Sequence, residues 1–238
     1  MAVKRLSTTS YAVLGLLALR DWSAYELVQQ MDRGVGIMWS FAPSMVYVEA
    51  KNLVSHGLAV DRAESNGARQ RTRYSITPAG TAALERWLAT PGAGPQLRFE
   101  GWLKVLFADF GTKEDLAATL SAARMWAEAV QTHGRRVAAD YLAGDYLNGT
   151  VPIEQRAHVL PLTFSLLWDL SELIIRWSDW AGQRLATWPA PGQTVDLDRH
   201  PFEQALRGAT TVTTPEEGSG EQFGVGVLRQ NGSDETVE

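Results

Sequence analysis

Residues 70–77 restrict the fold most strongly, because their side chains alternate in character instead of recurring at helical spacing. Ser65-Asn66-Gly67 is typical of a hairpin turn, so Leu58–Arg62 and Gln70–Thr77 are predicted to be paired strands. Thr72, Tyr74 and Ile76 fall on one face of the second strand. The opposite face carries Arg69, Arg71 and Arg73. The pattern therefore predicts an antiparallel hairpin with one arginine-rich face.

Two helices are predicted before this hairpin, within the first 35 residues. Apolar residues at helical spacing indicate the first, Thr9–Leu19. A glycine inside a helix costs about 1 kcal/mol relative to alanine, so Gly15 is expected to allow close helix packing. Asp21-Trp22 is expected to be a turn. Ser23 and Glu26 then match a capping box, which begins a second helix running to about Met31.

A third helix is predicted over Pro43–Ser55, because proline fits the first turn of a helix and Gly57 is a natural C-cap. After the hairpin, Pro78-Ala79-Gly80 begins a fourth helix that runs through Trp87-Leu88. The order of three helices, two strands and one linking helix is that of a winged helix-turn-helix domain.

The rest of the sequence divides at residues 91–95, whose prolines and glycines are typical of a linker. Residues 96–188 follow helical periodicity, whereas residues 189–238 are rich in Gly, Thr, Pro, Ser and acids and lack it. We expect a mainly α fold in three parts: a winged helix-turn-helix domain over 1–90, a helical domain over 96–188, and a mostly disordered acidic tail over 189–238.

The helical domain is predicted to contain a short helix over Phe99–Phe110 and two long ones. The first long helix begins after Thr112, and the second lies between Ile153 and about Thr187, where Pro161 should kink it or delay its start. Apolar residues recur in both at alternating steps of four and three, which is typical of a helix–helix seam. We expect part of this seam to join two copies of the chain in a homodimer. The residues assigned to that contact are Leu116, Leu120, Leu166, Leu170, Leu173, Trp177 and Trp180.

Six tryptophans lie between residues 102 and 188, and aromatic walls with a few polar groups are common in small-molecule pockets. A candidate effector pocket is therefore assigned to Trp126, His158, Trp168 and Arg176. The alternative is that these tryptophans fill the core of the dimer.

The distribution of charge favours a DNA contact in the N-terminal part. The whole chain has a net charge of −5, but residues 1–90 hold ten Lys and Arg against seven Asp and Glu, a net +3. In a winged helix the N-terminal residues of the third helix reach base edges in the major groove. Ser44 and Tyr47 are placed for this role, with Met45 as a thymine-methyl contact and Lys51 on a phosphate.

Phosphate contacts from the hairpin are assigned to Arg62, Arg69, Arg71 and Arg73, because an arginine-rich strand face suits the DNA backbone. Two alternatives stay open. Tyr47 could pack into the domain core, and the arginines could form only a solvated face.

Several function classes lose support from the composition. The chain has no cysteine, and its four histidines are widely spaced, so neither a metal site nor a cofactor is expected. No signal peptide or long apolar run is seen, which predicts a cytoplasmic protein without a membrane partner. Motifs of hydrolases, P-loop proteins, dinucleotide-binding proteins and zinc proteases are missing, so no enzyme is expected.

The sequence resembles the PadR family of bacterial transcription regulators over about residues 1–187. The stretches that carry the resemblance are TSYAVLGLLAL, SAYELVQQM, APSMVYVEAKNLVSHGLA and RQRTRYSITPAGTAAL, with LKVLFADF and SELIIRWSDWAGQRL in the helical half. The resemblance implies a homodimeric repressor that binds double-stranded DNA and is often released from its operator by a small molecule. Many members have Gly-Thr-Leu-Tyr where this chain has Ser44-Met45-Val46-Tyr47, which bears on base contacts rather than on the fold.

A second hypothesis is a winged-helix module for protein–protein contacts, with the helical half as its docking surface. It predicts no salt-dependent duplex binding.

Overall fold

The computed structural model describes residues 6–66, 69–189 and 195–208. Residues 1–91 and 99–187 form one compact unit, and residues 92–98 with 188–238 form a second. Within the second unit, helix α8 spans His200–Gly208. Most of the tail expected to be disordered lies outside the described residues.

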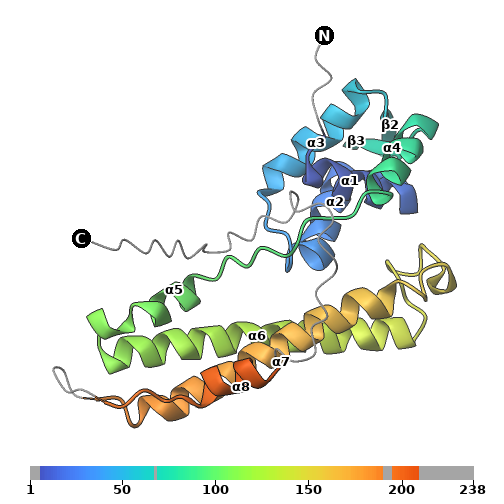
Figure 1. The fold of residues 1–238 in the computed structure, drawn as a ribbon. Helices are drawn as coiled ribbons and strands as arrows, with labels where there is room; N and C mark the ends of the chain where they lie inside the picture. Colours follow the sequence, from blue (N-terminus) through green and yellow to red (C-terminus); the bar gives the residue numbers. More distant parts are fainter. Residues whose placement is uncertain (1–5, 67–68, 190–194, 209–238) are drawn as a thin grey trace, which may run out of the picture. The chain divides into compact units, whose positions relative to one another are not determined.

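The first unit begins with three helices (Figure 1): α1 (Thr8–Leu19), α2 (Ala24–Gln30) and α3 (Pro43–Ser55). Ser7 and Ser23 begin the first two with capping boxes, in which each serine side chain accepts a backbone N–H at the third helical position. Beyond α2 the sequence predicted a helix end near Met31. The chain instead continues as a π-helix over Met31–Val35, closed by a 2.8 Å hydrogen bond from the Gly36 N–H to the Met31 carbonyl.

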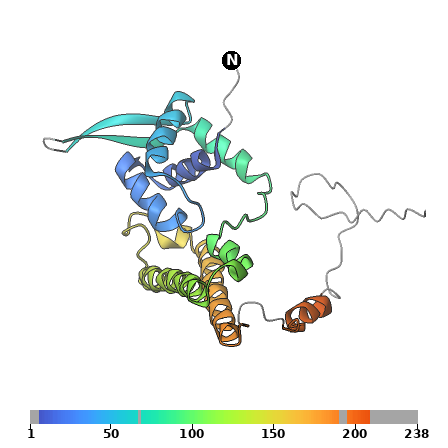
Figure 2. The ribbon, with the colours of Figure 1, turned by 90° about the vertical axis from the view of Figure 1, so that its left-hand side faces the viewer.

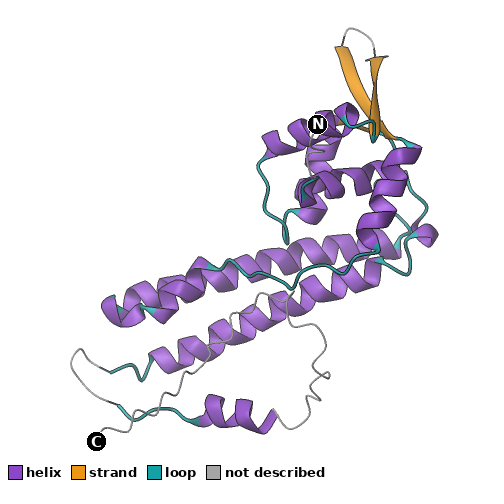
Figure 3. Ribbon diagram, turned by 45° about the horizontal axis from the view of Figure 1, so that its top comes forward, coloured by secondary structure: helices purple, strands orange, loops and turns teal. Residues whose placement is uncertain are grey.

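The sheet has three strands, one more than the sequence predicted. Strands β2 (Ala59–Asn66) and β3 (Arg69–Ile76) form the expected antiparallel hairpin, which projects beyond the helices (Figures 2 and 3). The added strand β1 (Trp22–Ser23) pairs with β3, with Trp22 opposite Tyr74. Ser23 has extended backbone because it caps α2, and the Trp22 indole donates to the Leu16 carbonyl at 2.7 Å. These two contacts hold the expected turn as a short strand.

The core of the winged helix-turn-helix fold lies where α1, α2, α3 and β3 meet. The buried apolar side chains are Val13, Leu14, Leu16, Leu17, Trp22, Leu27, Met31, Val46, Ala50, Leu53, Ala59, Tyr74 and Ala83, the last from α4 (Pro78–Leu88). Gly80 in α4 lies so close to the chain that an added Cβ would sit 2.1 Å from the Leu58 carbonyl oxygen. Gly15 has nothing within 4 Å of such a Cβ, so the expected close packing at Gly15 is wrong.

The remaining helices of the first unit are α5 (Glu100–Leu106), α6 (Lys113–Leu142) and α7 (Leu160–Leu185), with a 3-10 turn over Ala108–Phe110 after α5. Helices α6 and α7 lie side by side (Figure 1) and are antiparallel, since Arg124 pairs with Asp179 while Gly134 faces Trp168. Pro161 occupies the first turn of α7. That helix therefore starts late, and Ile153–Gln155 forms a separate 3-10 turn.

The turn between α6 and α7 joins two apolar clusters. Tyr146, Val151 and Leu160 form a small core of their own. Leu147 packs against this core and also against the core of the winged helix, although its backbone has a positive φ of 53°.

Candidate nucleic-acid interface

Helix α3 has one buried side and one exposed side. Its inner stripe of Val46, Glu49, Ala50 and Leu53 packs into the domain. The side chains that the sequence assigned to DNA lie on the other side, where Ser44, Met45, Tyr47 and Lys51 are all exposed. Tyr47 is thus on the surface in this structure rather than in the core.

Both ends of α3 are fixed by local features. Pro43 sits in its first turn, where no backbone N–H is needed, and Met45 N–H donates to the Ala42 carbonyl at 2.8 Å. Beyond the C-terminal end, Gly57 takes a φ of 69°, a conformation that glycine adopts without strain. Pro43 and Gly57 therefore set the two ends of the helix, although no side chain caps its N-terminus.

A buried polar contact also holds α3 against α1. The Ser10 hydroxyl donates to Glu49 Oε2 at 2.6 Å, and Ser7 bonds in turn to Ser10. Glu49 was not among the residues predicted to have a role. A signal was present, since Val46, Glu49, Ala50 and Leu53 follow the i, i+3, i+4, i+7 spacing of a buried helix face.

The register of the hairpin places its arginines on one face. Arg62 lies opposite Arg73, and Glu64 lies opposite Arg71, so these four residues share a side of the sheet. Arg69 pairs with Asn66 in the register, but its side chain lies outside the described part of the structure. Tyr74, on the other face, is buried.

The arginines of this face differ in their partners. Arg73 donates from Nε to Glu64 Oε2 at 2.9 Å and from Nη1 to the Asp21 carbonyl at 3.1 Å. The hydrogen bond to Glu64 raises the pKa of Arg73. Arg62 and Arg71 are exposed and make no ion pair among the described residues. They are therefore the side chains of this face most available to a phosphate.

The residues assigned to the dimer contact fall into two groups. Leu116 and Leu120 are buried among helices of their own chain. Leu166, Leu173 and Trp180 are exposed and recur every seven residues along α7. Leu170 and Trp177 are partly buried, and Trp177 meets the ring of Phe99 edge-on at 5.9 Å.

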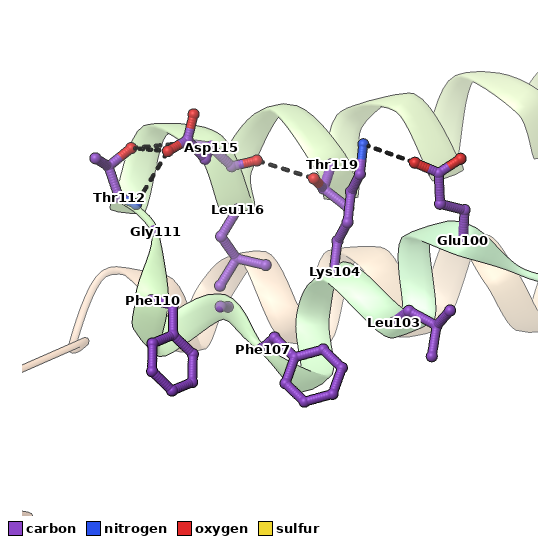
Figure 4. Close-up of a pocket in the computed structure, with 11 residues that line it drawn as sticks. Glu100, Leu103, Lys104, Phe107, Phe110, Gly111, Thr112, Asp115, Leu116 and Thr119 are labelled. Carbon is purple, nitrogen blue, oxygen red and sulfur yellow. Dashed lines mark hydrogen bonds and ion pairs between the residues drawn. The ribbon is translucent and has the colours of Figure 1, made fainter.

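Two shallow grooves lie on the helical part. The first, about 520 Å³, runs between α5 and the start of α6, and Figure 4 shows Leu103, Phe107, Phe110 and Leu116 along it. The second, about 660 Å³, is polar and is lined by Arg124, Glu128, Gln131, Thr132, Arg135, Glu172, Ile175 and Arg176.

The four residues of the candidate effector pocket do not line one groove together. Arg176 lines the polar groove and pairs with Glu172, whereas Trp126, His158 and Trp168 are not among the lining residues. The Trp168 indole donates to the same Glu172 at 2.9 Å.

The described ranges contain neither a metal-ion cluster nor a membrane-crossing helix. No group of three His, Asp or Glu side chains there is placed to hold a metal ion. None of the helices in these ranges combines the length and apolar character that a membrane crossing demands.

Comparison with known proteins agrees with the fold. The sequence model described as the Transcriptional regulator PadR-like family matches residues 13–86. The negative transcriptional regulator PadR of Bacillus subtilis is 30% identical over 99 residues, which cover 41% of this chain and 54% of that protein. The chain spans about half the length of the curated relatives it matches.

Solved structures are similar over a longer part of the chain. B. subtilis PadR in complex with operator DNA superposes with a TM-score of 0.64 at 19% identity, over 76% of this chain and 99% of that one. The complex of that protein with p-coumaric acid gives a TM-score of 0.56 at 19% identity, over 76% of this chain and 99% of that one. Residues 13–86 thus match the family of PadR-like transcriptional regulators, and the chain is similar in fold to B. subtilis PadR.

Proposed function

We propose that the chain is a DNA-binding transcriptional regulator that acts as a homodimeric repressor on a palindromic operator. The observation that carries the proposal is the exposed outer face of α3 next to a hairpin with two arginines, Arg62 and Arg71, that have no carboxylate partner among the described residues. Regulation of transcription, rather than catalysis, and a cytoplasmic location follow from this role.

The DNA contact would use two elements of residues 1–90, the proposed DNA-binding domain. Helix α3 enters the major groove, where Ser44, Met45 and Tyr47 meet base edges and Lys51 a phosphate. The hairpin follows the backbone, with Arg62 and Arg71 on phosphates. Arg69 and Arg73 belong to the same face. The Arg73 guanidinium would then contact a phosphate while it also donates to Glu64.

Dimerisation is assigned to residues 96–188. The exposed side chains of Leu166, Leu173 and Trp180 form an apolar stripe on α7, which a second copy would remove from water. A two-fold dimer places two copies of α3 on half-sites about 34 Å apart, or a multiple of that distance. The operator is therefore expected to be an inverted repeat.

A small-molecule effector is part of the proposal. B. subtilis PadR, which has a similar fold, has been solved in complex with p-coumaric acid. In this chain the polar groove contains three arginines, of which Arg124 and Arg176 pair with carboxylates, and Trp168 lies next to its Glu172. Trp126 and His158 do not line this groove, so their role in effector binding is a separate prediction.

Salt-dependent binding to duplex DNA tests this function. The native chain is titrated with the DNA upstream of its own gene at several salt concentrations, beside the double variant Arg62→Ala/Arg71→Ala. The slope of log K against log salt is negative, and each lost phosphate contact should reduce its magnitude by about 0.9. The matched control, Lys113→Ala/Arg136→Ala, removes two exposed cations from the helical part and should keep the native slope.

The outcome also decides between this function and a protein-interaction module. A native chain that binds duplexes weakly and without salt dependence, or a hairpin variant that behaves like the control, would refute DNA binding through the winged helix.

A further inference from the structure

The outer face of α3 is apolar where DNA-reading helices commonly carry amides or guanidinium groups. Met45, Tyr47 and Val48 have 43%, 40% and 50% of their surface exposed. At 100° per residue, Val48 lies with Ser44 and Lys51 along the centre of the exposed face, directly opposite the buried stripe. Met45 and Tyr47 flank this line on either side.

The fold does not account for Met45 and Val48. Neither belongs to the core of the winged helix or to the apolar side chains packed against it, whereas Val54 on the same helix does. A β-branched residue such as Val48 also slightly disfavours helix. Both side chains therefore expose apolar surface that nothing in the described structure covers.

The bases that this face could read follow from its chemistry. Guanine and adenine are read by Arg, Lys, Asn or Gln side chains, and cytosine by Glu or Asp. Residues 43–50 contain none of the first four types, and their one acid, Glu49, is buried against Ser10. Lys51 follows on the same face, but it lies two turns into the helix and is assigned to a phosphate. Among the four bases, thymine alone presents a methyl group in the major groove, and an apolar side chain recognises it by contact.

We propose that α3 recognises its half-site mainly through thymine C5-methyl groups, which Met45 and Val48 contact. Ser44 and Tyr47 add hydroxyl groups that can hydrogen-bond to any base or to phosphate, so they position the helix without choosing the base. The inference rests on the proposed DNA-binding function and specifies what that function selects, namely half-sites with thymine facing α3.

Replacing thymine by deoxyuridine tests this directly, because it removes the methyl group and leaves base pairing intact. Operator duplexes are first selected by the native chain from a random library. Each thymine of the selected half-site is then replaced singly, and affinity is measured at fixed salt. Each contacted methyl should cost about fourfold in affinity, which corresponds to the ~0.8 kcal/mol of one buried CH₂ group.

Variants assign the methyl groups to side chains. In Met45→Ala and Val48→Ala the penalty of deoxyuridine should vanish at the position that each residue contacts and persist at the others, as in a double-mutant cycle. Met125→Ala removes another exposed methionine, on α6, and should keep every penalty.

Two results overturn the inference and leave DNA binding intact: deoxyuridine is tolerated at every position, or its penalties are unchanged in both α3 variants. A native chain that selects no duplex overturns the proposed function and this inference with it.

Discussion

The hydroxyl of Ser10 on α1 donates a 2.6 Å hydrogen bond to the carboxylate of Glu49 on α3. Ser10 is 1% exposed and Glu49 7% exposed, so water reaches neither group freely. Asn52 adds a longer contact of 3.5 Å to the same carboxylate oxygen. The orientation of α3 about its own axis therefore depends on a polar contact as well as on apolar packing.

Replacing Ser10 by alanine should destabilise the fold. The change leaves the buried Glu49 carboxylate without its strongest partner, which typically costs about 2 kcal/mol. Glu49→Gln should cost less, because its amide oxygen can still accept the Ser10 hydroxyl. Denaturant unfolding of the three chains measures the difference.

Ser55→Ala is the matched control for that series, since Ser55 is an exposed serine near the end of α3. An unfolding free energy for Ser10→Ala equal to that of the control would show that the buried contact contributes nothing.

Two glycines should respond to alanine in opposite directions. In Gly80→Ala the new Cβ would lie 2.1 Å from the Leu58 carbonyl oxygen, so the backbone must move and the fold should lose about 3 kcal/mol. In Gly15→Ala nothing lies within 4 Å, and the chain should gain up to about 1 kcal/mol of helix stability. Thermal unfolding compares the two, and a stabilised Gly80→Ala chain would contradict the close approach of α4 to Leu58.

The proposed dimer predicts a sharp response to charge on α7. Leu166→Lys/Leu173→Lys should raise the dimer dissociation constant at least about hundredfold, because two leucines would lose the burial that a partner gives them. Sedimentation measures the change. Leu142→Lys alters an exposed leucine at the end of α6 and should stay dimeric. If the double change leaves the dimer unaffected, the interface does not include this stripe.

The N-terminus of α6 should show acid-dependent stability. The Thr112 hydroxyl and backbone N–H donate to Asp115, and these bonds lower the pKa of that carboxyl from its ordinary value of 3.8. Because the folded-state pKa is the lower one, the stabilisation is present above about pH 4 and is lost as the pH falls through the folded-state pKa.

Comparison of Thr112→Val with the native chain measures this effect. The difference in melting temperature should be largest near neutral pH and should narrow below about pH 4. Thr119→Val is the control, because the Thr119 hydroxyl donates to a backbone carbonyl and its effect should not depend on pH. A difference between Thr112→Val and native that stays constant down to low pH would exclude a role for the Asp115 charge.

Much of the fold could be predicted from sequence because its signals are local. Pro43 and Gly57 mark the ends of α3 in the sequence itself, and the alternation around Tyr74 determines which face of β3 is buried. Pro161 likewise predicted the late start of α7.

Other features depend on partners that are far away along the chain. Strand β1 exists because Trp22 meets Tyr74, 52 positions later, and the π-helix after α2 has no residue signature of its own. Arg73 had the same pattern as Arg71, yet only the register brings it against Glu64. The roles of individual site residues in binding remain predictions for the same reason, since they depend on molecules outside this chain.

Leu147 makes the two apolar clusters of the first unit depend on each other for their stability. It packs against both, and a leucine is held at a φ of 53° only where the surrounding structure compensates for the strain. Unfolding of either cluster would therefore remove packing contacts from the other. Heat or denaturant should melt the winged helix and the α6–α7 turn in a single cooperative transition, and substitutions at Leu147 should separate that transition into two.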